Sequence, residues 1–142
     1  MLRLTKQADY GLVLLSHFVA HGREAVHSAR DLAAETGLPL PTVGNVLKLL
    51  ARTGILSSQR GVNGGYALTV EPHQISVADV VQALEGPIGM TDCAPGASRS
   101  CEHEPHCMVR TPMQRINAAI RETLSKMTLA ELGSTTTTST PQ

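Results

Sequence analysis

All three cysteines of this 142-residue chain lie in one short polar segment, and this segment limits what the chain can fold into. The segment runs from Cys93 to Cys107 and reads CAPGASRSCEHEPHC. Its proline, glycine and serine residues disfavour a regular helix, and it has almost no apolar side chains with which to build a core. Because three thiols lie so close together, we expect a metal centre to order the segment.

The spacing of the cysteines leaves the kind of metal centre open. Seven residues separate Cys93 from Cys101, and five separate Cys101 from Cys107. Structural zinc ligands are usually about two to four residues apart, and zinc would also need His103 or His106, residue types that are more often solvated in a loop. An iron–sulfur cluster commonly takes cysteine at every protein ligand position, so a further ligand would come from elsewhere. This chemistry favours an iron–sulfur cluster, with zinc and plain reactive thiols as the alternatives.

The composition predicts a core of packed helices and an anionic partner for the first half of the chain. Of the residues, 42% are hydrophobic but 2% are aromatic, so leucine, valine, alanine and isoleucine must fill the interior. The length suits one compact domain with an appendage. Seven Lys and Arg against four Asp and Glu lie in the first 70 residues, whereas the rest carries five against eight. Anions should therefore prefer the N-terminal half.

An apolar run near the N-terminus is predicted to be a buried helix of a cytoplasmic protein. Residues 11–20 read GLVLLSHFVA and follow Arg3 and Lys6, which loosely imitates a signal peptide. Asp9 precedes the run, His17 interrupts it, and no small-x-small cleavage site follows. No run is long enough to span a membrane, and an odd number of cysteines opposes a closed disulfide framework.

The first half of the chain predicts a helix-turn-helix. A first helix should begin after Thr5 and end at Gly22. Ser28 can cap a short helix over residues 29–36, a turn follows, and a second helix runs over residues 41–52 with proline near its first position. Two short helices around a glycine-containing turn describe a helix-turn-helix, although an ordinary helical hairpin has the same pattern.

A β-hairpin after the second helix favours the DNA-binding interpretation. Residues 55–59 and 66–70 read as strands, and RGVNGG between them is a flexible turn. A hairpin in this place is the wing of a winged helix. Arg60 at its tip has no core to face and can reach a minor groove or a phosphate, unless the tip is merely solvated.

The second helix supplies the residues expected at DNA bases. Its early residues Thr42, Gly44 and Asn45 should meet base edges, whereas Lys48 lies further along and would meet a phosphate. Asn45 could make a bidentate contact to adenine. Gly44 has no side chain, so a strongly discriminating base contact is not expected there.

The remainder of the chain predicts two further helices and a tail. Ser76 can cap the first, over residues 77–84. After Pro112, an apolar stripe at helical spacing can dock on its own domain or on a second copy; it consists of Met113, Ile116, Ile120, Leu124 and Met127. We therefore expect a mainly α fold with a small β-hairpin wing and a long C-terminal dimerisation helix. The expected units are a winged helix-turn-helix domain at 1–87, a cysteine segment at 88–110, a dimerisation helix region at 111–132 and a disordered tail at 133–142.

Several of these segments together resemble one family. They are residues 4–11 (LTKQADYG), the helix-turn-helix, residues 60–66 (RGVNGGY), 75–80 (ISVADV), 85–87 (EGP) and the three cysteines. The combination resembles the Rrf-type winged-helix transcription regulators, which include IscR and NsrR. Within it, residues 26–29, 41–43, 85–88 and 114–117 are similar to the branch that regulates SUF-system iron–sulfur cluster assembly.

The resemblance implies a homodimer that binds a palindromic promoter site in double-stranded DNA and a cluster held by Cys93, Cys101 and Cys107, with 2Fe–2S favoured over 4Fe–4S. In IscR a histidine three residues after the last cysteine is the fourth ligand, but Arg110 stands there in this chain. In NsrR an aspartate near the start of the first helix of the other subunit completes the site, and Asp9 matches it. The alternative for Asp9 is a helix acid favoured by the helix dipole. The resemblance also places Thr42, Gly44, Asn45, Lys48 and Arg60 at DNA.

These inferences combine into one expected function. The chain should be an iron–sulfur cluster-sensing transcription regulator that represses cluster-assembly genes. The alternatives are a regulator of the same family that responds to nitric oxide or redox stress, and a winged-helix DNA binder with structural zinc. A thiol enzyme is disfavoured, because the chain has no Cys-x-x-Cys pair and no evident substrate pocket.

Overall fold

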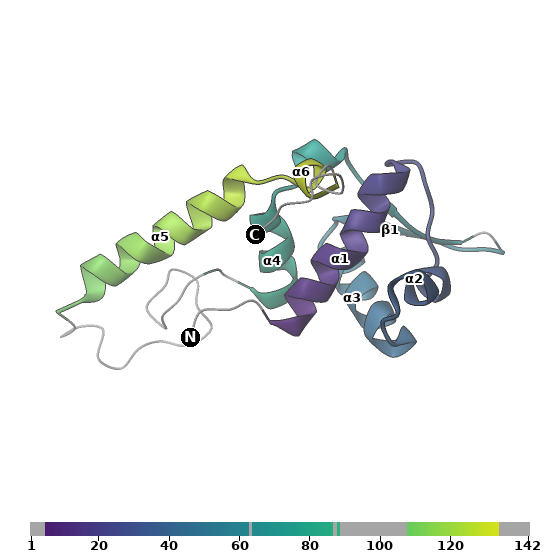
Figure 1. Cartoon of the computed structure of the whole chain (residues 1–142), viewed down its shortest axis with the longest axis horizontal. Coiled ribbons are helices and arrows are strands. Elements are labelled where there is room, and N and C mark those ends of the chain that lie inside the picture. Colours follow the sequence, from purple (N-terminus) through teal and green to yellow (C-terminus); the bar gives the residue numbers. More distant parts are fainter. Residues whose placement is uncertain (1–4, 63, 87, 89–107, 134–142) are drawn as a thin grey trace, which may run out of the picture.

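A computed structural model describes residues 5–62, 64–86, 88 and 108–133 of the chain. The fold is mainly helical with one two-stranded hairpin (Figure 1). The elements in order are α1 (Lys6–His21), α2 (Ala29–Thr36), α3 (Leu40–Arg52), β1 (Leu56–Gln59), β2 (Gly65–Leu68), the 3-10 turn η1 (Pro72–Gln74), α4 (Val77–Glu85), α5 (Arg110–Lys126) and α6 (Leu129–Gly133). The winged-helix fold class with a long C-terminal helix is confirmed.

Side-chain caps begin three of the helices where the sequence predicts them. The Thr5 hydroxyl accepts from the Ala8 amide at 3.2 Å, and the Ser28 hydroxyl accepts from the Asp31 amide at 3.0 Å. Ser76 and Asp79 form a reciprocal capping box at the start of α4. Each cap satisfies amide groups that the first helical turn leaves without a partner.

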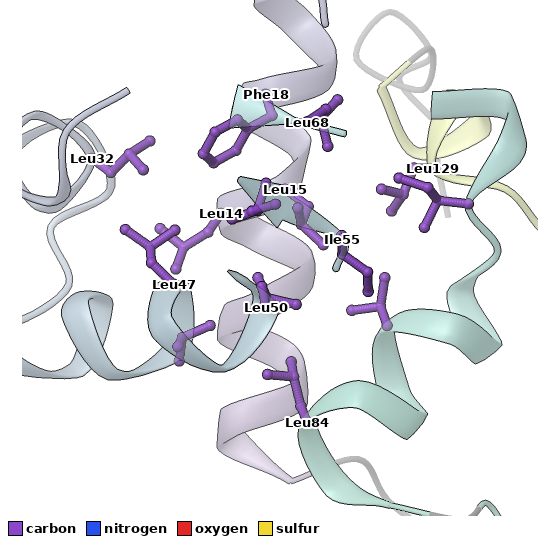
Figure 2. Close-up of a cluster of buried hydrophobic side chains, with 14 of the residues drawn as sticks. Leu14, Leu15, Phe18, Leu32, Leu47, Leu50, Ile55, Leu68, Leu84 and Leu129 are labelled. Atoms are coloured by element: carbon purple, nitrogen blue, oxygen red, sulfur yellow. The ribbon is translucent and has the colours of Figure 1, made fainter. Parts of the chain in front are cut away.

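The core is aliphatic and centres on α1, as Figure 2 shows. Leu14, Leu15 and Phe18 of α1 are fully buried among side chains from α2, α3, the wing, α4 and α6. Helices α1 and α4 approach so closely at Gly11 that a Cβ there would overlap with Leu84. The scarcity of aromatic residues thus gives the leucine-rich interior that the composition predicts.

The wing is an antiparallel hairpin with one end in the core. Leu56 pairs with Leu68 at its base, and Gln59 pairs with Gly65 next to the turn. The two leucines are buried, whereas residues 57–59 are exposed, so the hairpin projects from the domain. The strands begin or end one or two residues from the predicted 55–59 and 66–70.

The long helix α5 ends earlier than the apolar stripe predicts. The stripe includes Met127, but Met127 has an extended backbone (φ −94°, ψ 127°). Its carbonyl accepts from the Val77 amide at 2.8 Å, and the Leu129 amide donates to the Ile75 carbonyl at 2.9 Å. The helical prediction for Met127 is therefore wrong, because main-chain pairing with residues 75–77 replaces the helical hydrogen bonds there.

Helix α6 returns the chain to the winged-helix domain. Leu129 is fully buried in the same hydrophobic cluster as Leu14 and Ile55, and Figure 1 shows α6 next to α1 and α4 while α5 extends away. Within the residues that the structure describes, no helix is long and apolar enough to cross a membrane.

Candidate nucleic-acid interface and cysteine segment

One face of α3 is buried and the opposite face is open. Val43, Val46, Leu47 and Leu50 lie in the core. At about 100° of rotation per residue, Gly44, Asn45 and Lys48 lie on the opposite face. Asn45 and Lys48 are exposed, and Thr42 at the border is half-buried. The structure thus brings four of the predicted DNA-binding residues together on α3.

Gly44 is not required by the packing of the chain. A Cβ built there would meet no atom of the described residues within 4 Å. Glycine in a helix interior costs about 1 kcal/mol relative to alanine. The missing side chain therefore leaves open space in front of α3 into which a binding partner can approach.

Arg60 lies directly after β1, at the beginning of the wing turn, and is exposed. No hydrogen bond or ion pair joins its guanidinium to another described residue. The main-chain path of the turn brings Gly64 so close to Gln59 that a side chain at position 64 would overlap with the Gln59 carbonyl. Among the described residues, Arg60 is thus a cation without a partner at the beginning of the wing turn.

A third extended segment, which the sequence analysis missed, supports the wing. His27 forms an isolated antiparallel bridge with Tyr66, and Arg23 Nη2 donates to the Thr69 carbonyl at 3.0 Å. The short run between Gly22 and the capping residue Ser28 is the only sequence sign of this segment, since the pairing joins residues far apart in sequence.

Cys93, Cys101 and Cys107 lie outside the described residues, as do His103 and His106. The flanking residues are described. Ile88 is buried against α4, and its carbonyl accepts from Arg121 Nη1 at 3.5 Å. Met108 and Val109 are exposed where α5 begins. The cysteine segment therefore joins the end of α4 to the end of α5 that lies away from the domain (Figure 1).

Asp9 is exposed in the first turn of α1, and no other described residue pairs with its carboxylate. At the same corner, the Thr5 hydroxyl hydrogen-bonds to the Glu85 carboxylate at the end of α4. No three His, Cys, Asp or Glu side chains are grouped for a metal within the described part of the chain. As donor types, soft thiols together with a carboxylate suit an iron–sulfur cluster or zinc.

Helix α5 carries an open apolar groove of about 330 Å³. The groove is lined by Ile116, Ala119, Ile120, Thr123 and Leu124. Ile120 and Leu124 also pack against the buried cluster formed by α4 and Ile88, whereas Ile116 is 40% exposed. The predicted stripe is therefore covered by its own domain on one side and open on the other.

Comparisons with known proteins agree with this architecture. Residues 4–135 match the Rrf2 family, described as "Iron-dependent Transcriptional regulator". The protein rrf2 of Nitratidesulfovibrio vulgaris is 30% identical over 92% of this chain and 87% of its own length. The HTH-type transcriptional regulator IscR of Vibrio cholerae is 24% identical over 92% of this chain and 75% of its own length. The structure of CymR, the global cysteine regulator of B. subtilis, superimposes with a TM-score of 0.78 and 29% identity, over 96% of this chain and 99% of that one.

The family match covers residues 4–135, which include α3, the wing and the cysteine segment. This chain belongs to the Rrf2 family of winged-helix transcriptional regulators.

Proposed function

We propose that this regulator acts as a homodimer on a palindromic promoter site and that an iron–sulfur cluster on Cys93, Cys101 and Cys107 sets its affinity for DNA. The observation that carries the proposal is the course of α5. The N-terminal end of this helix, which follows the cysteine segment in the chain, extends away from its own domain, and the helix carries an open apolar groove.

The proposed DNA contacts come from α3 and the wing. Thr42 and Asn45 would read base edges, Lys48 would bind a phosphate, and Gly44 would allow close approach of α3. Arg60 would reach the minor groove or the backbone. Their support is the shared open face of α3 and the free guanidinium at the wing.

The proposed dimer forms through α5. An exposed apolar groove on a helix that leaves its domain is a surface that a second copy can cover. Two copies related by a two-fold axis would present two α3 helices, and such a pair reads two half-sites of a palindrome.

The geometry of α5 also supports Asp9 of the other subunit as the fourth ligand. The helix has 17 residues and therefore spans about 25 Å. Its C-terminal end is fixed to its own domain by α6, and its N-terminal end, which follows the cysteine segment in the chain, lies away from α1 in Figure 1. In an antiparallel pair of α5 helices, that end would lie beside the domain of the partner. A 2Fe–2S cluster is the form we propose.

The proposed regulation follows from the attachment points of the cysteine segment. When bound, the cluster would supply an iron centre that oxidants, nitric oxide or iron scarcity can modify, and a hard carboxylate ligand would make it more labile than thiolates alone. The segment joins α4 to α5, so its order would set the distance between the two α3 helices. We propose repression of iron–sulfur cluster assembly genes by this cytoplasmic regulator.

The wild-type protein tests this function. Anaerobically purified protein should contain iron and acid-labile sulfide, and its affinity for DNA upstream of cluster-assembly genes should differ between the loaded and the stripped forms. Random duplex DNA at the same salt concentration is the control. A colourless protein with stoichiometric zinc and unchanged DNA affinity would instead favour the zinc-stabilised DNA binder.

Arg60→Ala is expected to weaken operator binding by about tenfold, or ~1.4 kcal/mol, because it removes a cation at the DNA. The slope of log affinity against log salt should fall by about one. Arg60→Lys should restore the slope but not all of the affinity if the planar guanidinium fits a groove. Lys126→Ala, at an exposed lysine at the C-terminal end of α5 that does not line the groove, is the charge-matched control. Equal affinity of wild-type and Arg60→Ala protein in gel shifts would show that the wing does not contact DNA.

A further inference from the structure

The segment of residues 23–28 connects the wing directly to the helix-turn-helix. The His27 amide donates to the Tyr66 carbonyl and the Tyr66 amide donates to the His27 carbonyl, both at 2.8 Å. At the base of the hairpin, Arg23 Nη2 donates to the Thr69 carbonyl at 3.0 Å. The next residue after His27 is Ser28, which caps α2. The position of β2 is therefore tied to α2 through these six residues.

The wing and this segment lie in unusually close contact. Gly65, the first residue of β2, has φ +156°. A side chain at position 65 would overlap with the main chain of His27 and Ser28. A shift of the His27 main chain would therefore change the orientation of the wing.

The ring of His27 fixes the segment to α1. His27 is 8% exposed, and its ring lies edge-on to Phe18 at 4.7 Å and to His21 at 5.1 Å between ring centres. Its Nε2 atom is buried and has no hydrogen-bond partner among the described residues. A neutral ring tolerates this environment because one of its nitrogens is an acceptor without a proton, whereas a protonated ring would bury an N–H donor without an acceptor.

We propose that His27 is a positioning residue for DNA binding, whose neutral ring holds the 23–28 segment against α1 and so orients the wing, and whose protonation releases it. The proposal rests on the proposed DNA-binding function and adds a proton-dependent control of the wing to it.

The electrostatic surroundings favour the neutral ring. Burial is the main cause that lowers the pKa of His27 from its ordinary value of 6.5, and His21 and His17 of α1 lower it further. Glu35 and Asp31 of α2 act in the opposite direction. Glu35 is also engaged by His17, whose Nδ1 lies 3.3 Å from its carboxylate. At the contact with His27, the wing contributes the main-chain amide and carbonyl of Tyr66.

The direction of the pH effect follows from this lowered pKa. The released ring takes up a proton at a higher pH than the packed ring does, so the packed arrangement is fully favoured above about pH 6.5. Its stability falls as the pH decreases below that value toward the lower pKa of the packed ring. Acidification should therefore release the 23–28 segment.

The test is operator affinity between about pH 7.5 and pH 5.5 at constant ionic strength, with all proteins in the same cluster state. Wild-type affinity is expected to fall about fivefold or more, in the range of ordinary coupling between sites. His27→Phe and His27→Gln, two variants without the titrating ring, should bind with nearly constant affinity. Arg60→Ala should also lose most of the pH dependence, because orientation of the wing no longer matters without its DNA contact. His73→Gln, at an exposed histidine of η1, should behave as wild type.

A second measurement observes the wing itself. Exchange of the Tyr66 amide hydrogen, followed by NMR at acidic pH, should be faster in wild-type protein than in His27→Phe. A pH dependence that persists in both His27 variants, or in Arg60→Ala, would overturn the proposal, as would equal protection of the Tyr66 amide. A protein that binds no DNA at any pH would refute the proposed function, and the Tyr66 amide would still decide whether protonation releases the wing.

Discussion

Cys101→Ala protein purified without oxygen is expected to contain neither iron nor acid-labile sulfide and to show no visible absorption band. The chain has three cysteines, so no spare thiol can replace the one that is removed. The fold should persist, because the described core is built from residues between Leu14 and Leu84 together with Leu129. Circular dichroism should therefore match that of stripped wild-type protein. Ser100→Ala, one residue away, is the control and should load normally. Wild-type iron content in Cys101→Ala would remove this cysteine from the ligand set.

Mixing Cys101→Ala with Asp9→Ala protein shows whether Asp9 binds the cluster of its own chain or that of the partner subunit. In a mixed dimer, the intact cysteines belong to the Asp9→Ala chain, and the intact Asp9 belongs to the Cys101→Ala chain. A ligand from the partner subunit predicts one wild-type site per mixed dimer, and a ligand from the same chain predicts none. Asp31→Ala is the matched control, because Asp31 is also an acid in the first turn of a helix. Identical spectra and cluster lifetimes of Asp9→Ala and wild-type protein would leave Asp9 with its helix-dipole contribution, about 0.3–1 kcal/mol.

The elements that the sequence predicts well are those with local causes. Thr5, Ser28 and Ser76 begin helices because each cap needs only the amide three positions further along the chain. In helix α3 the buried residues Val43, Val46, Leu47 and Leu50 recur at helical spacing, so the exposure of Asn45 and Lys48 also has a local cause. These features depend on neighbours in sequence and can therefore be predicted without knowledge of the tertiary fold.

The features that the sequence analysis missed depend on distant residues. The bridge between His27 and Tyr66 joins segments about 40 residues apart, and the break after α5 pairs Met127 with Val77. A local sign of that break does exist, since the Thr128 amide donates to the Glu131 carboxylate in the manner of a helix cap. For the cysteine segment, the spacing suits several metals, so the thiols alone do not determine the fourth ligand.

Leu129→Ala is expected to lower the free energy of unfolding by about 2–5 kcal/mol, the usual cost of truncating a fully buried leucine. Leu129 is 0% exposed and belongs to the core cluster that includes Leu14 and Ile55 (Figure 2). It is also the first residue of α6, and its amide is bound to the Ile75 carbonyl. The truncation should therefore weaken both the core and the attachment of α5 to the winged-helix domain. Urea unfolding at fixed protein concentration measures the change, because a dimer gains stability with concentration.

Met127→Ala is the control that shows whether the loss of stability in Leu129→Ala comes from the docking of α6. Met127 lies two residues earlier and is 45% exposed, so its truncation should change stability by about 0.5 kcal/mol or less. If α6 fixes α5, Leu129→Ala should also reduce operator affinity under conditions in which the winged-helix domain remains folded, since the two α3 helices would lose their fixed spacing. Met127→Ala should bind as wild type. Equal unfolding midpoints for the two variants would show that α6 contributes little to the core, and unchanged operator affinity of Leu129→Ala would show that the spacing of the α3 helices is set without it.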